Sequence, residues 1–199
     1  MKNKNSLTVS DLISTGIYTA VYFVFLTIAT FASSLIIPAY GMILIPAFAA
    51  LLCSVVYYLL ALKVQKFGAL TLMGIVMGIF YFASGHFPLS FIPAIVFGLL
   101  ADIIANTGKY KNKTSLTASY VVFSFSNAGP ILPLYFTKKA YIENLIARGK
   151  DSVYIDKLFS QISITTFFIF VATTVILAIL GSIFAQKMMK KHFEKAGVI

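Results

Sequence analysis

The sequence has little charge and few of the side chains that carry out chemistry. Only 11% of its 199 residues are charged, and it contains six carboxylates, two histidines, one cysteine and no tryptophan. The single cysteine, Cys53, has no partner for an internal disulfide or for a zinc site. No HExxH motif and no phosphate-binding loop of the Walker type occurs. These gaps predict a protein that is not an enzyme and that holds no metal or cofactor.

Apolar residues make up most of the chain. The chain is 59% hydrophobic, which excludes an ordinary soluble domain. Charge-free runs cover 12–62, 67–101, 114–137 and 158–186. A membrane-crossing helix needs about 20 apolar residues, so these runs accommodate six crossings, some of them short. We expect an all-α integral membrane protein with a single domain, a bundle of six transmembrane helices near 11–34, 42–62, 67–83, 89–106, 114–136 and 158–189, and a long loop at 137–157.

The net charge of +10 is spread over helix ends, which argues against a nucleic-acid surface. With six crossings, eleven of the sixteen basic residues fall on one side of the membrane; they are Lys2, Lys4, Lys63, Lys66, Lys109, Lys111, Lys113, Lys187, Lys190, Lys191 and Lys195. The other five lie in the long loop. Basic residues concentrate on the cytoplasmic side, so both termini are predicted to be cytoplasmic. The first apolar run lacks a clear cleavage site and is expected to remain as an anchor.

The segment 84–113 combines a turn, an apolar helix and a basic end. Gly85 and Pro88 favour the turn, and three lysines follow the helix. Asp102, near the cytoplasmic end, is the only carboxylate in the interior of a predicted span. A carboxylate there is costly unless it is paired. We expect it to pair with Lys109 or another lysine, or to cap backbone groups, and to lie outside any ligand site.

The predicted fifth helix is expected to be bent or broken, because Gly129, Pro130 and Pro133 interrupt it. Freed backbone groups at membrane depth are tolerated only inside protein or beside a wet cavity. Asn127 lies in the same half of the helix. Two interpretations remain open: an outward-facing ligand cavity, or a structural kink with a hydrogen bond from Asn127.

If the cavity exists, its residues should share one membrane depth in the outer half. Asn127 is the strongest candidate, since its amide both donates and accepts. The other candidates for substrate binding are Ser126, Tyr40, His86, Tyr81, Tyr135, Gln161 and Thr165, with Ser124 and Phe87 in support. Each aromatic has an alternative role as an interface anchor, and His86 as an exposed loop residue.

Gly16 and Ala20 form a pair of small residues four apart on the first helix, and Ala29 and Ser33 form a second. Such pairs let helix backbones approach closely in lipid. They indicate either packing within the bundle or docking of a partner.

Three segments resemble one known family. These are SDLISTGIYTAVYF at the start, GHFP, GLLADII and GKYKNK in the centre, and KKHFEKAGVI at the end. The chain resembles the Trep_Strep family of integral membrane proteins, among the substrate-binding S components of energy-coupling factor (ECF) transporters. The resemblance implies a six-helix bundle in the bacterial plasma membrane that captures a small vitamin-like nutrient. It also implies a scaffold T subunit and two ATPase subunits as partners, with Gly16 and Ala20 at the docking position where two alanines are usual.

Two other functions compete with this one. A structural or assembly protein would use the same small-residue faces without a ligand. A lipid-modifying membrane enzyme is disfavoured by the missing clusters of acids and histidines.

Overall fold

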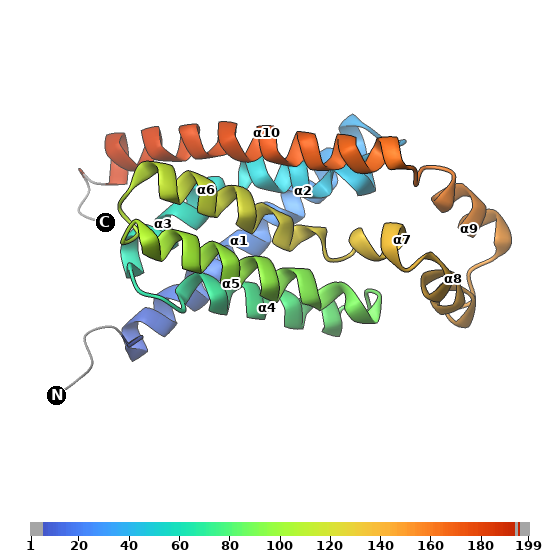
Figure 1. Ribbon diagram of the computed structural model, residues 1–199, viewed down its shortest axis with the longest axis horizontal. Coiled ribbons are helices and arrows are strands. Elements are labelled where there is room, and N and C mark those ends of the chain that lie inside the picture. Colours follow the sequence, from blue (N-terminus) through green and yellow to red (C-terminus); the bar gives the residue numbers. More distant parts are fainter. Residues whose placement is uncertain (1–5, 194, 196–199) are drawn as a thin grey trace.

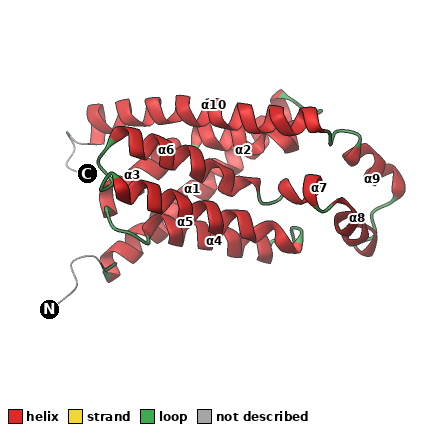
Figure 2. Ribbon diagram, viewed as in Figure 1, coloured by secondary structure: helices red, strands yellow, loops and turns green. Residues whose placement is uncertain are grey.

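The computed structural model describes residues 6–193 and 195. Within that part the chain is helical and contains no strand (Figure 2). The helices, with short 3-10 or π segments marked η, are α1 (Val9–Ile36), α2 (Gly41–Leu52), α3 (Ser54–Val64), α4 (Ala69–Ala83), η1 (Pro88–Ser90), α5 (Phe91–Thr107), α6 (Lys113–Ser124), η2 (Phe125–Ala128), α7 (Leu132–Phe136), α8 (Lys138–Ala147), α9 (Ser152–Phe159), α10 (Ile164–Met188) and η3 (Met189–Phe193).

The long helices lie side by side in one elongated bundle (Figure 1). The start of α1 and the end of α10 lie at one end of it, which we call the termini end. Helices α8 and α9 project from the opposite end, which we call the α8–α9 end. Lys2 and Lys4 lie outside the described residues. The other nine lysines predicted to be cytoplasmic fall in or beside the turns and helix ends of the termini end, whereas Lys138 to Lys157 belong to the α8–α9 end.

Within the described residues, three helical stretches are long and apolar enough to cross a membrane: α1, Pro88–Thr107 and Ile164–Phe193. Helices α2 and α3 qualify together as a fourth, with a bend of 49° between them. Helix α4 is apolar but has only 15 residues. Large apolar side chains cover the outer faces of α1 and α10, as a lipid environment requires. The described part of the chain is therefore all-helical and suited to a membrane, with three or four candidate spans.

The expected continuous helix at 42–62 is divided at Cys53. At this point two backbone carbonyls accept hydrogen bonds from side-chain hydroxyls. The Tyr120 hydroxyl donates to the Ala50 oxygen at 2.6 Å, and the Ser54 hydroxyl donates to the Leu51 oxygen at 2.9 Å. Such bonds compete with the helical ladder and bend helices. Because Tyr120 comes from α6, the bend depends on tertiary structure.

Helices α4 and α5 approach each other through glycines. A Cβ atom added to Gly74 would lie 2.5 Å from the Ala94 oxygen and 3.0 Å from the Gly98 Cα. Both contacts are with backbone atoms. No larger side chain fits there without moving one helix, so Gly74 and Gly98 fix the α4–α5 spacing.

Asp102 is fully buried at the termini end of α5. Its Oδ2 accepts hydrogen bonds from the Gly68 and Thr71 amides, at 2.8 and 2.9 Å, and from the Thr71 hydroxyl at 2.8 Å. Its Oδ1 accepts one from the Tyr110 hydroxyl at 2.5 Å. The carboxylate thus caps the start of α4 and ties it to the α5–α6 turn. Of the two expected roles, these hydrogen bonds are those of the backbone cap.

Candidate functional site

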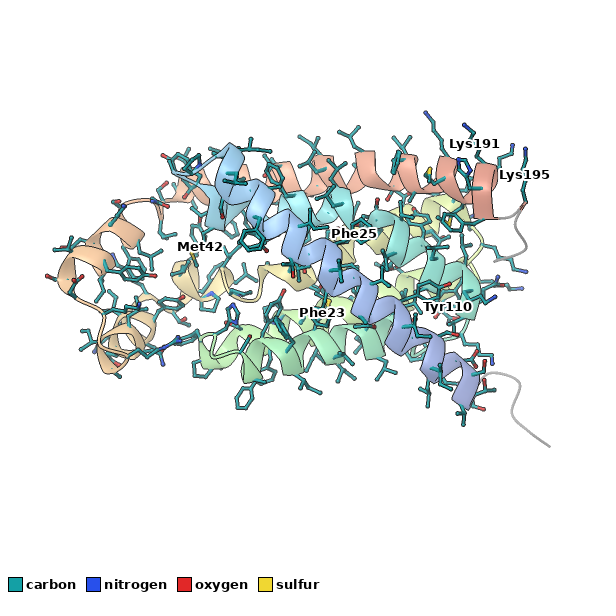
Figure 3. All side chains as sticks on the ribbon, turned by 180° about the vertical axis from the view of Figure 1, so that it is seen from behind. Phe23, Phe25, Met42, Tyr110, Lys191 and Lys195 are labelled. Carbon is teal, nitrogen blue, oxygen red and sulfur yellow. The ribbon has the colours of Figure 1, made fainter. Side chains whose placement is uncertain are left out.

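A cavity of about 390 Å³ lies in the half of the bundle near the α8–α9 end. Figure 3 shows Phe23 and Met42 in this half, and Tyr110, Lys191 and Lys195 at the termini end. The walls of the cavity come from α1, α2, α4, the turn after α4, the broken segment before α7, and α8. The lining residues are Phe23, Leu26, Thr27, Thr30, Phe31, Met42, Ile45, Phe80, Tyr81, His86, Asn127, Pro130, Ile131 and Tyr141. The volume falls in the range of about 300–1,000 Å³ typical of small-molecule sites.

Aromatic contacts join the elements around the cavity. Phe23 of α1 and Phe80 of α4 lie 4.7 Å apart by ring centroids. Tyr141 of α8 stacks on Phe87 at 5.1 Å. Phe87 is buried although it belongs to a turn. Helix α8 is thereby held against the turn after α4, with one face towards the cavity.

The break before α7 brings Asn127 to the cavity wall. Its side-chain nitrogen donates to the Tyr22 hydroxyl at 2.9 Å, and its side-chain oxygen accepts from the Tyr81 hydroxyl at 3.4 Å. The residue is only 2% exposed. A Cβ added to Gly129 would clash with the Ser90 backbone oxygen, so this position admits only glycine as the segment stands. Asn127 therefore combines a structural hydrogen-bond network with a small exposed edge in the cavity.

His86 lines the cavity from the turn after α4. Its Nδ1 lies 2.9 Å from the Ser84 hydroxyl, and its ring meets Tyr81 edge-on at 5.4 Å. Partial burial lowers the pKa of His86 from its ordinary value of 6.5, and the nearby Arg148 charge acts in the same direction. The neutral imidazole has one donor and one acceptor nitrogen, of which Nδ1 is engaged with Ser84.

None of the residues around the cavity is charged. The Thr27 and Thr30 hydroxyls donate hydrogen bonds within their own helix, to the backbone oxygens of Phe23 and Leu26 respectively, each at 2.9 Å. Each hydroxyl oxygen can still accept a hydrogen bond. The cavity therefore offers flat aromatic walls and a few hydrogen-bonding groups, and no charged side chain lines it. Such a lining suits a neutral molecule with a planar, largely apolar body.

The structure brings together three of the predicted substrate residues, Asn127, His86 and Tyr81. It places the others elsewhere. Tyr40 and Thr165 line a separate hollow of about 310 Å³ beside the start of α10. Tyr135 lines another, of about 320 Å³, and its hydroxyl lies 3.1 Å from that of Thr166.

Two predicted residues line none of these hollows. Ser126 is fully buried, with its hydroxyl 4.0 Å from the Met77 sulfur. Gln161 belongs to the turn between α9 and α10, where its backbone oxygen accepts from Thr166. The supporting candidate Ser124 donates to the Tyr120 oxygen of its own helix.

Sequence reasoning missed the contribution of α1. Phe23, Thr27 and Thr30 recur at helical spacing and thus share a face, which was a signal available from the sequence. Tyr141 of α8 also lines the cavity and was not among the predicted residues. Among the described residues, no group of three or more potential metal ligands occurs.

One known protein family matches the chain over most of its length. A family model described as a hypothetical bacterial integral membrane protein (Trep_Strep) matches residues 9–195. The chain belongs to the Trep_Strep family. The match covers every helix described above, from α1 to η3. No curated protein and no solved structure matches this Trep_Strep chain.

Proposed function

We propose that this Trep_Strep protein is the substrate-binding subunit of an ECF-type importer in the bacterial plasma membrane. The observation that carries the proposal is the uncharged, aromatic-walled cavity of about 390 Å³ near the α8–α9 end. Its ligand is a small, neutral, vitamin-like nutrient with a planar ring system. Aromatic walls hold the ring, and the few polar groups orient it. The test is whether the purified protein retains such a molecule.

The energy for import has to come from other subunits. The sequence contains no Walker motif, and Asp102 is the only carboxylate deep in a predicted span. Asp102 is engaged by four donor groups as a structural cap. The proposal therefore includes two ATPase subunits and a scaffold T subunit.

The proposed docking face lies on α1. Gly16 and Ala20 are both exposed, and a Cβ added to Gly16 would meet no atom within 4 Å. By contrast, Ala29 and Ser33, the second small pair, are fully buried, and the Ser33 hydroxyl donates to the Gly41 oxygen at 2.6 Å. Only the first pair remains available for a helix of another subunit to approach.

We expect the double variant Gly16→Leu/Ala20→Leu to lose the scaffold and the ATPases on affinity purification. Leucines at both positions would hold the partner helix away, whereas within the bundle both positions are exposed and a Cβ added to Gly16 meets no atom within 4 Å. The matched control is Ala172→Leu, at an exposed position on α10. Equal recovery of the partners with the double variant, the control and the parent would contradict docking through this face.

We also propose six crossings with both termini in the cytoplasm. Besides the three or four candidate spans, α4 and the broken series α6–η2–α7 run beside the others (Figure 1). Helix α4 is about 22 Å long at 1.5 Å per residue, shorter than a bilayer core of about 30 Å. Local thinning of the bilayer accommodates such a mismatch.

A membrane-impermeant maleimide tests this topology in intact cells. A cysteine at Lys150 should react, and a cysteine at Lys111 should react only after permeabilisation, because the two lie at opposite ends of the bundle. The parent protein is the blank, since Cys53 is fully buried. Labelling at position 111 from outside, with position 150 protected, would overturn the orientation.

The alternative proposal is a structural or assembly protein without a ligand. It uses the same exposed face of α1 but assigns no role to the cavity. A protein that copurifies with partners and carries no small molecule would favour this alternative.

A further inference from the structure

A second, smaller hollow lies at the termini end of the bundle, far from the cavity described above. Its volume is about 100 Å³. It is bordered by α3, the turn before α6, the start of α6, the end of α10 and η3. Its lining residues are Tyr58, Leu62, Lys111, Lys113, Leu116, Gln186, Met189 and Lys190. Three of these eight side chains are lysines, and none is a carboxylate.

The turn that carries Lys111 is held in an unusual conformation. Lys109 and Tyr110 have φ angles of 51° and 57°, in the left-handed region that non-glycine residues seldom adopt. Tyr110 is 2% exposed, and its hydroxyl bonds to the Asp102 carboxylate at 2.5 Å. Two consecutive residues in this region persist only where the surroundings enforce them. The buried Asp102 therefore fixes the turn from which Lys111 reaches the hollow.

The start of α6 adds to the positive potential. Lys113 is its first residue, and Asn112 caps it by accepting a hydrogen bond from the Ser115 amide at 3.0 Å. A helix N-terminus carries partial positive charge. This end of α6, Lys111, Lys113 and Lys190 all favour an anion in the same place.

The remaining walls suit a molecule that is polar at one end only. Gln186 donates from its side-chain nitrogen to the Tyr58 hydroxyl at 3.1 Å and to the Thr117 hydroxyl at 2.9 Å. These two bonds use both of its donors and leave the side-chain oxygen as an acceptor for a hydroxyl group. Leu62, Leu116 and Met189 supply the apolar surface.

We propose that this hollow binds the phosphate-bearing headgroup of an anionic phospholipid. The lysines contact the phosphodiester, Gln186 accepts a hydrogen bond from a hydroxyl such as that of a glycerol headgroup, and the three apolar residues contact the glycerol backbone and the first acyl carbons. A basic pocket between helices at the membrane surface is the setting in which proteins recognise anionic headgroups. The site does not depend on the nutrient cavity and stands if that cavity binds nothing.

The experiment is a native mass spectrometry titration of the full chain in detergent with phosphatidylglycerol, and with phosphatidylcholine of the same acyl chains. The test variant replaces Lys111, Lys113 and Lys190 with glutamine. The matched control replaces Lys109, Lys187 and Lys191 with glutamine. These three lysines are exposed at the same end and do not line the hollow. Both variants lose the same charge, so a general attraction of the lipid to the surface weakens equally in both. Thermal unfolding of each shows that it is folded.

The expected result is one tightly bound phosphatidylglycerol, a loss of affinity of about tenfold or more in the test variant, and a change of less than about threefold in the control. Equal losses in the two variants would reduce the site to surface electrostatics and overturn the proposal. Equal binding of phosphatidylcholine would overturn it too. An excess of inorganic phosphate distinguishes the sources of the anion: failure to displace the lipid supports a lipid site, and full displacement identifies a free-phosphate site instead.

Discussion

The Gly74→Ala variant is expected to unfold at a temperature roughly 5 to 10 °C below the parent in detergent, which corresponds to a cost of about 2–3 kcal/mol. A new Cβ at this position would lie 2.5 Å from the Ala94 oxygen and 3.0 Å from the Gly98 Cα. Both obstacles belong to the backbone, so α4 and α5 have to separate. The effect opposes helix propensity, which favours alanine over glycine by about 1 kcal/mol.

Gly16→Ala is the matched control for this variant, because Gly16 also lies within a helix and has nothing within 4 Å of an added Cβ. It should unfold at the parent temperature or slightly above. A loss of stability in both variants would point to a general intolerance of the helices to substitution. If Gly74→Ala is as stable as the parent, the close approach of α4 and α5 is contradicted.

Replacing Asp102 with alanine is expected to cost about 3 kcal/mol or more, since buried donors left unpaired cost about 1–3 kcal/mol each. The Gly68 and Thr71 amides, the Thr71 hydroxyl and the Tyr110 hydroxyl all lose their acceptor. Asp102→Asn should cost less, because the amide oxygen still accepts, and Tyr110→Phe removes a single bond. Thermal unfolding of the three variants gives the order of their stabilities.

Ligand affinity distinguishes a structural Asp102 from one in the nutrient site. Asp102 does not line the cavity near the α8–α9 end. The folded Asp102→Asn variant should therefore bind the nutrient within about threefold of the parent, a difference of less than about 1 kcal/mol. A variant that stays folded and no longer binds would contradict this assignment.

Helix positions and the broken segment follow from local sequence. Charge-free runs delimit the helical stretches, and glycine with proline marks the turn at Gly85–Pro88 and the interruption around Gly129. The division at Cys53 has no such local mark. It results from the Tyr120 hydroxyl of another helix taking the Ala50 carbonyl, which sequence spacing does not reveal.

The membrane depth of the candidate site could be predicted from the sequence, but only some of the residues that line it could. Asn127, His86 and Tyr81 share the cavity, whereas Tyr40, Thr165 and Tyr135 lie beside other hollows at the same end. Membrane depth can be estimated from distance along a helix. The direction in which a side chain points around the bundle depends on how helices pack, so it requires the structure. Gly16 and Ala20 illustrate the same point, because only the structure shows that they face outward.

The most direct test of nutrient capture is native mass spectrometry of the protein purified from bacteria grown in rich medium, with two matched tryptophan variants on α1. Thr30 lines the cavity, whereas Ile28, two residues earlier, is 50% exposed and does not. Thr30→Trp fills the cavity, and Ile28→Trp adds the same bulk to the outside. The account predicts that the parent and Ile28→Trp carry one small neutral molecule and that folded Thr30→Trp carries none. A parent that retains no molecule, or a Thr30→Trp variant that retains it as well as Ile28→Trp does, would contradict capture in this cavity.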